Sequence, residues 1–326
     1  MSSVIRWGIL GTAHIGHSLL RAIGDATGNC VQAVASREWT RASEWAREFG
    51  VPRVFGSYEE MLASGEIDAV YNPLPNSLHA EWTIRSLEAG LPVLCEKPFT
   101  MTANEAREVA AVAARTHLPV AEAFMYRYHP IYDRVLQSIQ AGDIGNVMAI
   151  RSAFTFRLPD HSNIRWSKAL GGGSLMDIGC YCVNVSRLIA GTEPVRVAAI
   201  ERRIEVDGTM IGVLRFPNGL LSHFESSFEQ YGRSYVAIEG SEGIITIPKP
   251  WLPGSDFSEY TIKRAEHEET VRVPGADTYL LEVEDFGNAC RTHASTRWPI
   301  EDAIANMTVI DSLYKAAAQG RRVEIG

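Results

Sequence analysis

The sequence predicts an α/β domain with a parallel sheet over residues 1–122 and an α+β domain with an open, mainly antiparallel sheet over residues 123–326. Two observations lead to this fold class. In the first part, short apolar runs alternate with amphipathic stretches of helical length, which is typical of βαβ units. In the second part, apolar runs follow one another directly across short turns, which is typical of hairpins.

The first domain is expected to alternate strictly between strand and helix. Its strands are expected at residues 4–10, 31–35, from 54, 67–71, 91–95 and 118–121, and its helices at 14–23, 40–49, from 57, 78–89 and 102–116. Capping boxes begin the helices after Ser57 and Thr102, and Gly90 ends another helix. Parallel strands need crossover connections of this length, so the pattern predicts a parallel sheet.

The second domain is expected to contain consecutive strands between helices. Helices are expected near 130–141, 174–190, 280–291 and 300–319, and strands at 197–206, 210–216, 220–228, 235–240 and 244–247. Asp207-Gly208 and Asn218-Gly219 are hairpin turn signals. Successive hairpins predict an antiparallel sheet.

Composition excludes several classes of protein. A net charge of −8 argues against a nonspecific nucleic-acid binder, which usually carries a basic surplus. No apolar run reaches the roughly 18 residues of a membrane helix, and the N-terminus lacks the features of a signal peptide. Five scattered cysteines fit a reducing compartment, so we expect a cytoplasmic protein with structural thiols. No spacing of Cys and His predicts a metal site.

A glycine-bearing loop joins the first expected strand to the first expected helix. Gly11-x-Ala13-x-x-Gly16 is a dinucleotide-binding pattern with alanine at the second glycine position. Gly11 permits a tight turn, Ala13 lets a pyrophosphate approach the backbone, and Gly16 lets the helix pack closely on the strand. The helix N-terminus that follows favours an anion.

The end of the second expected strand favours NADP over NAD. An NAD site usually has an acidic residue there, which binds the ribose hydroxyls. This chain has Ser36 and Arg37 instead, with Arg41 one helical turn later. A guanidinium group suits a 2′-phosphate, although Glu38 would repel that phosphate if it pointed inward.

Five stretches together resemble the glucose–fructose oxidoreductase / inositol dehydrogenase (Gfo/Idh/MocA) family. They are GILGTAHIG, PLPNSLHA at 73–80, CEKPF at 95–99, EAFMYRYHP at 122–130 and GGGSLMDIGCY at 171–181. The resemblance implies a Rossmann domain followed by an open-sheet domain, and hydride transfer between a nicotinamide and a sugar-like hydroxyl or carbonyl. It also implies a cis peptide bond between Lys97 and Pro98. Many members have histidine where this chain has Tyr181, a departure that resembles the branch of dimeric dihydrodiol dehydrogenase and the NADP-dependent xylose dehydrogenases.

Lys97, Tyr181 and Asp177 are the expected catalytic residues. Lys97 follows a parallel strand at its carboxyl end, where Rossmann domains place their chemistry. Asp177 and Tyr181 are four residues apart on an expected helix, so they share a face that could meet Lys97 across the domain cleft. Tyr181 is expected to be the general acid/base, with Lys97 lowering its pKa and Asp177 holding the substrate or orienting the pair. The roles of Lys97 and Tyr181 could be exchanged.

Further binding residues are expected around these three, and each has a structural alternative. Substrate contacts are expected from Phe156, Arg165 and Trp166, in addition to Asp177 and Tyr181, although the first three could serve ordinary domain-interface packing. His79 could instead cap its helix, and Arg127 could belong only to a helix start. The full set of expected cofactor contacts is Gly11, Thr12, Ala13, His14, Ile15, Ser36, Arg37, Arg41, Pro73, Leu74, Asn76, His79, Glu96, Lys97 and Arg127.

Together with these residues, the resemblance implies the function of an NADP-dependent aldose or cyclic-diol dehydrogenase, or of a sugar ketoreductase. Two alternatives remain open at this point: an oxidoreductase that retains NADP(H) and couples two sugars, and a non-catalytic dinucleotide-binding sensor. The expected partner is a small carbohydrate-like substrate, without nucleic acid or membrane. The resemblance also implies a homodimer or homotetramer formed through the C-terminal sheet.

Overall fold

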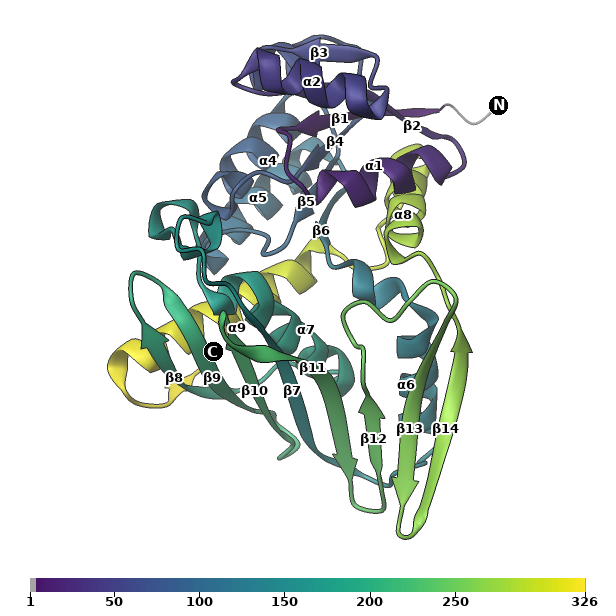
Figure 1. The fold of residues 1–326 in the computed structure, drawn as a ribbon, viewed down its shortest axis with the longest axis vertical. Coiled ribbons are helices and arrows are strands. Elements are labelled where there is room, and N and C mark those ends of the chain that lie inside the picture. Colours follow the sequence, from purple (N-terminus) through teal and green to yellow (C-terminus); the bar gives the residue numbers. More distant parts are fainter. Residues whose placement is uncertain (1–3, 326) are drawn as a thin grey trace. The chain divides into compact units, whose positions relative to one another are not determined.

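The computed structural model describes residues 4–325, which form two compact units (Figure 1). The first unit comprises the chain up to Met125 together with Tyr279–Ile304, and the second comprises Tyr126–Thr278 and the chain from Ala305 onward. The sequence placed all of residues 123–326 in the second domain. The structure instead assigns part of the C-terminal region to the first unit.

The first unit contains a six-stranded parallel sheet, sheet A, in the order β3-β2-β1-β4-β5-β6. Its strands are β1 (Ile5–Leu10), β2 (Asn29–Ala35), β3 (Arg53–Phe55), β4 (Ala69–Asn72), β5 (Val93–Glu96) and β6 (Val120–Ala123). Its helices are α1 (Gly16–Asp25), α2 (Trp39–Phe49), α3 (Tyr58–Ala63), α4 (His79–Glu88), α5 (Ala103–Thr116) and most of α8 (Thr278–Thr292). This is the strand order of a Rossmann domain, so the predicted fold class is confirmed.

Helix α8 belongs to the first unit because it completes the core of that unit. Val283 and Phe286 are buried in the same hydrophobic cluster as Trp7 of β1, and the rings of Trp7 and Phe286 lie 5.5 Å apart. A buried aromatic side chain contributes a large apolar area. The amphipathic pattern of residues 280–291 predicted the helix, but could not show which sheet it covers.

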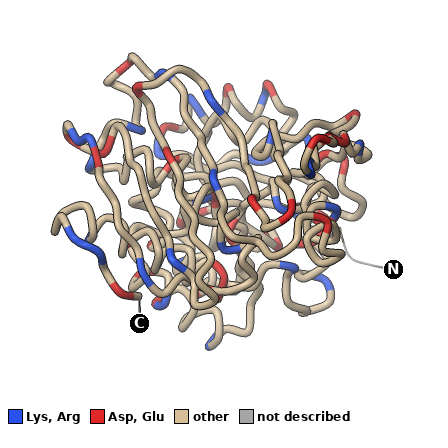
Figure 2. Tube along the Cα trace, turned by 90° about the horizontal axis from the view of Figure 1, so that it is seen from below, with Lys and Arg blue, Asp and Glu red and all other residues tan. Residues whose placement is uncertain are grey.

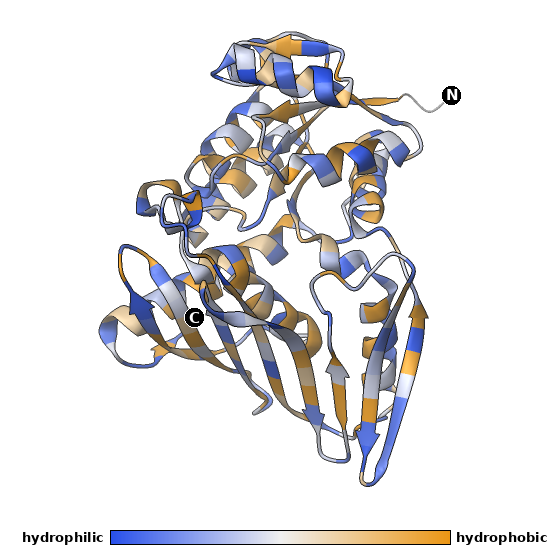
Figure 3. Cartoon of the chain, viewed as in Figure 1, coloured by the Kyte–Doolittle hydropathy of each residue, from blue (hydrophilic) through white to orange (hydrophobic). Residues whose placement is uncertain are grey.

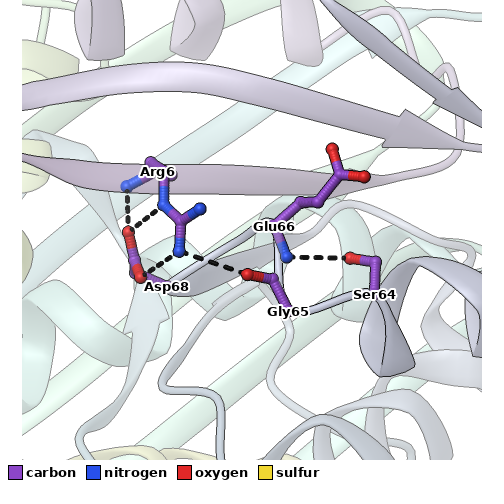
Figure 4. Close-up of polar contacts among 5 residues, drawn as sticks. All are labelled: Arg6, Ser64, Gly65, Glu66 and Asp68. Carbon is purple, nitrogen blue, oxygen red and sulfur yellow. Dashed lines mark hydrogen bonds and ion pairs between the residues drawn. The ribbon is translucent and has the colours of Figure 1, made fainter.

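One ion pair joins β1 to the turn before β4 (Figure 4). Arg6 Nε and Nη2 donate to the two carboxylate oxygens of Asp68 at 2.8 and 2.9 Å, and the Arg6 backbone N–H donates to Asp68 as well. The Arg6 hydrogen bond lowers the pKa of the Asp68 carboxyl. Both side chains are more than a third exposed, so the ion pair contributes little to the free energy of unfolding, and its main effect is to hold the turn before β4 against β1.

The second unit contains a nine-stranded sheet, sheet B, in the order β14-β13-β12-β11-β7-β10-β9-β8-β15. Every neighbouring pair is antiparallel except β7 and β10, which run parallel. The strands are β7 (Val147–Arg157), β8 (Arg196–Arg203), β9 (Asp207–Arg215), β10 (Leu221–Ser227), β11 (Glu229–Gly240), β12 (Ile244–Ile247), β13 (Phe257–Arg264), β14 (His267–Pro274) and β15 (Val323–Glu324). The helices are α6 (Pro130–Gln140), α7 (Cys180–Ala190) and most of α9 (Ile300–Gln319).

One face of sheet B is packed and the other is open. On β9, Met210 and Leu214 are buried while Ile211 and Val213, which point to the opposite face, are exposed. Figure 3 shows hydrophobic and hydrophilic residues side by side along these strands. Gly212 lies on the packed face, where an added Cβ would meet the ring of Phe224 at 2.3 Å.

Four strands of sheet B were not predicted from the sequence: the two-residue β15, which is too short to show a pattern, and the three longer strands β7, β13 and β14. The central strand β7 carries buried polar residues on both of its faces, Ser152 on one and Thr155 on the other, so neither face is continuously apolar. Strands β13 and β14 are rich in polar residues, and β14 is an edge strand. Hydrophobic alternation is the main sequence signal of a strand, and in these three it is weak.

One of the two hairpin turn signals was wrong. Gly219 has a left-handed φ of 88°, and Phe216 N–H donates to Leu220 O, so Asn218-Gly219 is a turn as predicted. Asp207 and Gly208 instead lie within β9, where Asp207 pairs with Arg203. Asp207 is buried, and side chains of other elements use its carboxylate, as described below.

Within residues 4–325, no helix is both long and apolar enough to span a membrane. All five cysteines are free thiols, and Cys95, Cys180 and Cys182 are buried. Figure 2 shows basic and acidic residues interspersed along the chain.

Candidate cofactor and catalytic site

The glycine loop follows β1 at the point where the strand order of sheet A reverses. β1 lies between β2 and β4, so the loops after β1 and β4 leave the sheet at the same edge. Gly11 has a φ of 83°, which favours glycine, and its N–H donates to Ala35 O at 2.7 Å. An added Cβ at Gly11 would lie 3.1 Å from Leu74 Cδ2, so the two loops are in contact.

The N-terminus of α1 is left without a side-chain cap. Ile15 occupies the N-cap position and supplies no hydrogen-bonding side chain. A helix start of this kind favours an anion. Gly16 allows close packing as predicted, but against a helix rather than the strand, because an added Cβ would lie 3.2 Å from Trp45 Cζ2 of α2.

Two guanidinium groups lie beside the glycine loop. Arg41 Nη2 donates to Thr12 O at 3.4 Å. Arg37 makes a hydrogen bond to the hydroxyl of Tyr58, an oxygen that would lie 3.8 Å from a Cβ at Gly11. Burial raises the pKa of Tyr58, and the positive charge of Arg37 opposes this shift. The structure therefore gathers Gly11, Thr12, Arg37 and Arg41, and adds Tyr58, which the sequence reading missed.

Ser36 and Glu38 occupy the turn between β2 and α2. Ser36 is largely buried, and its Oγ accepts the N–H of Glu38 at 3.2 Å. Glu38 itself is exposed at the start of α2. The hydroxyl of Ser36 thus shapes the turn that presents Arg37.

The loop after β4 is held by buried side chains. Asn72 Nδ2 donates to His79 O at 3.1 Å, and His79 Nε2 lies 2.7 Å from Leu74 O. His79 Nδ1 lies 2.8 Å from Pro98 O, so the ring joins the loop after β4 to the loop after β5. Burial lowers the pKa of His79 to about 4, against the effect of the two carbonyl oxygens. His79 is 1% exposed, so it is placed as a brace between the loops; its role as a cofactor contact stays a prediction.

Lys97 follows β5 and is half-buried. Its backbone N–H donates to Glu96 Oε2 at 3.2 Å, while Glu96 Oε1 accepts the hydroxyl of Tyr71 at 2.7 Å. The Lys97–Pro98 peptide bond is cis, as the resemblance implied. Beyond it, Phe99 N–H donates to the buried Glu122 at 2.9 Å. Side chains from β4 and β6 therefore fix the backbone on both sides of Lys97.

In the second unit, Asp177 lies in η5 (Leu175–Gly179), a π-helical turn that leads directly into α7. The i, i+4 rule for an α-helix therefore does not describe the pair of Asp177 and Tyr181 as the sequence reading assumed. Arg165 Nε donates to Asp177 Oδ2 at 2.7 Å. The structure thus brings together two residues that were predicted separately, one as a catalytic group and one as a substrate contact.

Tyr181 lies in an aromatic cluster. Its ring centroid is 5.6 Å from Tyr126, 5.7 Å from Phe154 and 5.6 Å from Trp251. The indole N–H of Trp251 is buried without a protein partner. The sequence reading missed these three neighbours. Phe154 and Tyr126 stood near stretches already singled out, whereas Trp251 lies in an irregular segment that gave no signal.

Three other predicted residues lie in packed surroundings in the second unit. Trp166 is 4% exposed in a cluster with Phe228, and its indole N–H donates to Leu158 O. Phe156 packs on the same Phe228 ring at 5.4 Å. Arg127 is 2% exposed. Their ligand contacts stay predictions, and the burial of Trp166 favours the packing alternative.

The residues of the first unit fit a dinucleotide with an additional phosphate. A glycine with left-handed φ, an uncapped helix start and two arginines beside one loop form a cradle suited to anions. Among residues 4–325, no group of three His, Cys, Asp or Glu side chains is arranged to hold a metal ion.

Comparison with known proteins agrees with this geometry. Residues 5–124 match the family model described as an oxidoreductase family with an NAD-binding Rossmann fold, and residues 132–246 match the GFO/IDH/MocA C-terminal domain. The D-xylose 1-dehydrogenase (NADP(+)) 2 of Haloferax volcanii is 39% identical to this chain over 324 residues, which cover 98% of this chain and 99% of that protein. The chain belongs to the GFO/IDH/MocA family.

Two further relatives lie in the branch expected from the sequence or close to it. The trans-1,2-dihydrobenzene-1,2-diol dehydrogenase of Bos taurus is 31% identical, over 81% of this chain and 79% of its own length. The crystal structure of KijD10, a 3-ketoreductase from Actinomadura kijaniata in complex with NADP and TDP-benzene, matches with a TM-score of 0.92 and 30% identity, over 96% of this chain and 97% of that one. This GFO/IDH/MocA member is thus related to named dehydrogenases and reductases along most of its length.

The buried imidazole of His79 predicts an acid-sensitive first unit. An unfolded histidine has a pKa near 6.5, so between pH ~6.5 and ~4 the unfolded state binds the proton more readily than the folded state. Stability is therefore present above this window and is lost as the pH falls through it, by at most about 3 kcal/mol from this group. In His79→Gln, urea unfolding at pH 7, 6 and 5 should give a shallower loss of stability than in wild type.

The exposed His267 provides a control. His267→Gln should keep the wild-type pH dependence. An unchanged slope in His79→Gln would show that this imidazole is not held neutral in the folded state.

Proposed function

We propose that this chain is an NADP-dependent oxidoreductase that moves a hydride between the nicotinamide and a sugar or related cyclic polyol or ketone. The observation that carries the proposal is the pair of guanidinium groups, Arg37 and Arg41, beside the glycine loop. Arginine binds phosphate oxygens through planar, charge-assisted hydrogen bonds. The NADP dependence named for the Haloferax volcanii relative supports the same choice.

In this proposal, Gly11, Ala13 and the start of α1 bind the pyrophosphate, while Arg37 and Arg41 bind the 2′-phosphate. When bound, the nicotinamide supplies or accepts the hydride. The protein has to move the matching proton. Tyr181 takes the hydroxyl proton as a tyrosinate in oxidation and returns it as a neutral phenol in reduction, and the Lys97 ammonium stabilises the tyrosinate and the developing oxyanion.

Arg165 and Asp177 suit the recognition of a diol. A guanidinium group donates N–H bonds and a carboxylate accepts O–H bonds, and the ion pair places one of each side by side. Neighbouring hydroxyl groups of a sugar both donate and accept, so the pair can satisfy two of them. The half-buried side chain of Phe154 beside Tyr181 offers an apolar surface for the C–H face of a sugar ring, and the buried Trp251 stacks on it at 5.6 Å.

Replacing Arg37 should remove the preference for NADP. Each charge-assisted hydrogen bond to the phosphate contributes about 1.5–3 kcal/mol, so Arg37→Ala should raise the KM for NADP by roughly 10- to 100-fold and leave the KM for NAD nearly unchanged. Steady-state kinetics with both cofactors measure this. Arg47→Ala, on the exposed side of α2, is the matched control. Equal losses with both cofactors would remove the phosphate-binding role of Arg37.

Replacing the proposed proton carrier should lower kcat without weakening cofactor binding. General acid–base catalysis typically contributes 10²- to 10⁴-fold, so Tyr181→Phe and Lys97→Met should each reduce kcat by at least about 100-fold, and Tyr181→Phe should do so at an unchanged dissociation constant for NADP. The variant that abolishes the pH dependence of kcat identifies the proton carrier.

The matched controls for these variants are Tyr231→Phe, at a 93% exposed position, and Lys263→Met, on the exposed side of β13. Both should keep the wild-type kcat. A Tyr181→Phe enzyme with wild-type kcat would contradict the assignment.

We also propose that the open face of sheet B binds a second copy of the chain. Ile200, Ile211, Val213 and Leu221 are 43–78% exposed on the adjacent strands β8, β9 and β10, and Ile200 pairs directly with Ile211. An exposed apolar patch on neighbouring strands is typical of an interaction surface. A two-fold dimer buries the same patch of both copies.

Light scattering during size-exclusion chromatography tests this assembly. Wild type should run as a dimer or tetramer, and Ile211→Glu should shift the mass toward that of the 35.9 kDa monomer because it places a charge in the interface. Leu252→Glu, at a 63% exposed position outside the patch, should keep the wild-type mass. A monomeric wild type would contradict the proposal.

A further inference from the structure

We propose that Asp207 is a positioning residue, whose buried carboxylate holds the start of the π-helical turn that carries Asp177 and leads into the helix of Tyr181. The inference rests on the proposed function only for the catalytic importance of Asp177 and Tyr181. The carboxylate lies in the second unit with both of them. Asp207 lies within β9 and is not part of a hairpin turn, although the Asp207-Gly208 pair predicted one.

Three donors from two other segments converge on this carboxylate. Leu175 N–H donates to Asp207 Oδ2 at 2.7 Å, and Ser174 Oγ donates to the same oxygen at 3.0 Å. Tyr314 of α9 donates its hydroxyl to Asp207 Oδ1 at 2.8 Å. Asp207 is 1% exposed. Both carboxylate oxygens are therefore used inside the protein, and one of them bonds directly to the first residue of η5.

The turn needs this partner because it lacks a local one. Ser174 occupies the N-cap position of η5, yet its side chain does not cap the turn. The first N–H groups of any helix have no partner within the helix, and a negative charge near a helix N-terminus is stabilising. Asp207, 32 residues from Leu175 in sequence, supplies both the acceptor and the charge.

The glycines around the turn leave room for this arrangement. An added Cβ at Gly173, whose φ is 125°, would lie 2.3 Å from Asp207 Oδ1. An added Cβ at Gly172 would lie 2.3 Å from Arg165 O, and one at Gly179 would lie 2.9 Å from Ser226 Oγ. The GGGS stretch thus allows the backbone to approach the carboxylate on one side and the Arg165 segment on the other.

The arrangement links the buried carboxylate to the proposed substrate-binding pair. Gly173 N–H donates to Arg165 O, and Asp177 N–H donates to Gly173 O at 3.0 Å. Asp177 then accepts from Arg165 Nε. A displacement of the turn would therefore move the Asp177 carboxylate relative to its Arg165 partner, and a misplacement of about 1 Å can cost roughly 100-fold in rate.

The charged neighbours of Asp207 do not replace its role. Burial raises the pKa of Asp207, whereas the Leu175 N–H, the Tyr314 and Ser174 hydroxyls and the charge of Arg203 act in the opposite direction. Arg203 itself bonds Glu201 through Nε at 2.8 Å. Of Asp207, Arg203 and Glu201, Asp207 is therefore the one that bonds Ser174 and Leu175 directly.

The test compares Asp207→Ala, Asp207→Asn and Tyr314→Phe in the full chain. Hydrogen exchange followed by mass spectrometry reports the backbone of residues 174–179, and steady-state kinetics report kcat and the KM for NADP. In Asp207→Ala, exchange of this segment should be at least about 10-fold faster, and kcat should fall about 10-fold or more, with the KM for NADP within twofold of wild type.

Asp207→Asn should recover part of both losses, because an amide oxygen can still accept the Leu175 N–H. Tyr314→Phe keeps both bonds to Oδ2 and should show the smallest effect, so it remains informative if Asp207→Ala folds poorly. Glu193→Gln is the matched control. It removes a carboxylate that bonds Arg187 near the far end of α7, and it should leave residues 174–179 and kcat unchanged.

The outcomes separate this inference from the proposed function. Unchanged exchange at residues 174–179 in Asp207→Ala would overturn the inference. Faster exchange with a wild-type kcat would overturn the positioning role. Faster exchange in Asp207→Ala would support the bond between Asp207 and the turn even if the wild-type chain oxidises no sugar. That lack of activity would count against the proposed function.

Discussion

The candidate site depends on one constraint: a buried backbone N–H or C=O group must have a hydrogen-bond partner. The segments that carry the proposed chemistry are irregular, so neither helix nor sheet supplies those partners. In the first unit the neutral ring of His79 donates its single N–H to one of the two carbonyl oxygens beside it, those of Leu74 and Pro98, and Glu122 accepts the N–H of Phe99. In the second unit Asp207 accepts the N–H of Leu175. Buried polar side chains thus fix loops that would otherwise lack a defined geometry.

This constraint explains why the sequence predicted the chemical groups better than their supports. The glycine loop, Arg37 and Lys97 follow strands directly, so local pattern was sufficient to propose them as site residues. Their supports come from distant positions: Glu122 lies 23 residues from Phe99, and Asp207 lies 32 residues from Leu175. A single sequence carries no signal for such pairs, and Asp207-Gly208 even resembles a turn.

The fold, too, was predicted where local sequence pattern determines it and missed where distant residues determine it. Strict alternation of strand and helix predicted the parallel sheet, because each element has its own local period. The central strand β7 was missed since its buried positions include Ser152 and Thr155, and α8 was placed with the second domain since its amphipathic pattern does not show which core it joins. Tertiary packing determines both features; for α8 the deciding contact is that of Phe286 with Trp7.

Initial rates with the wild-type protein would show whether the chain oxidises sugar-like alcohols with NADP. NADPH formation would be measured with a panel of aldoses and trans-dihydrodiols, first with NADP and then with NAD. We expect turnover of at least one of these substrates with NADP, and far less with NAD. No turnover with any substrate and either cofactor, or equal rates with both cofactors, would contradict it.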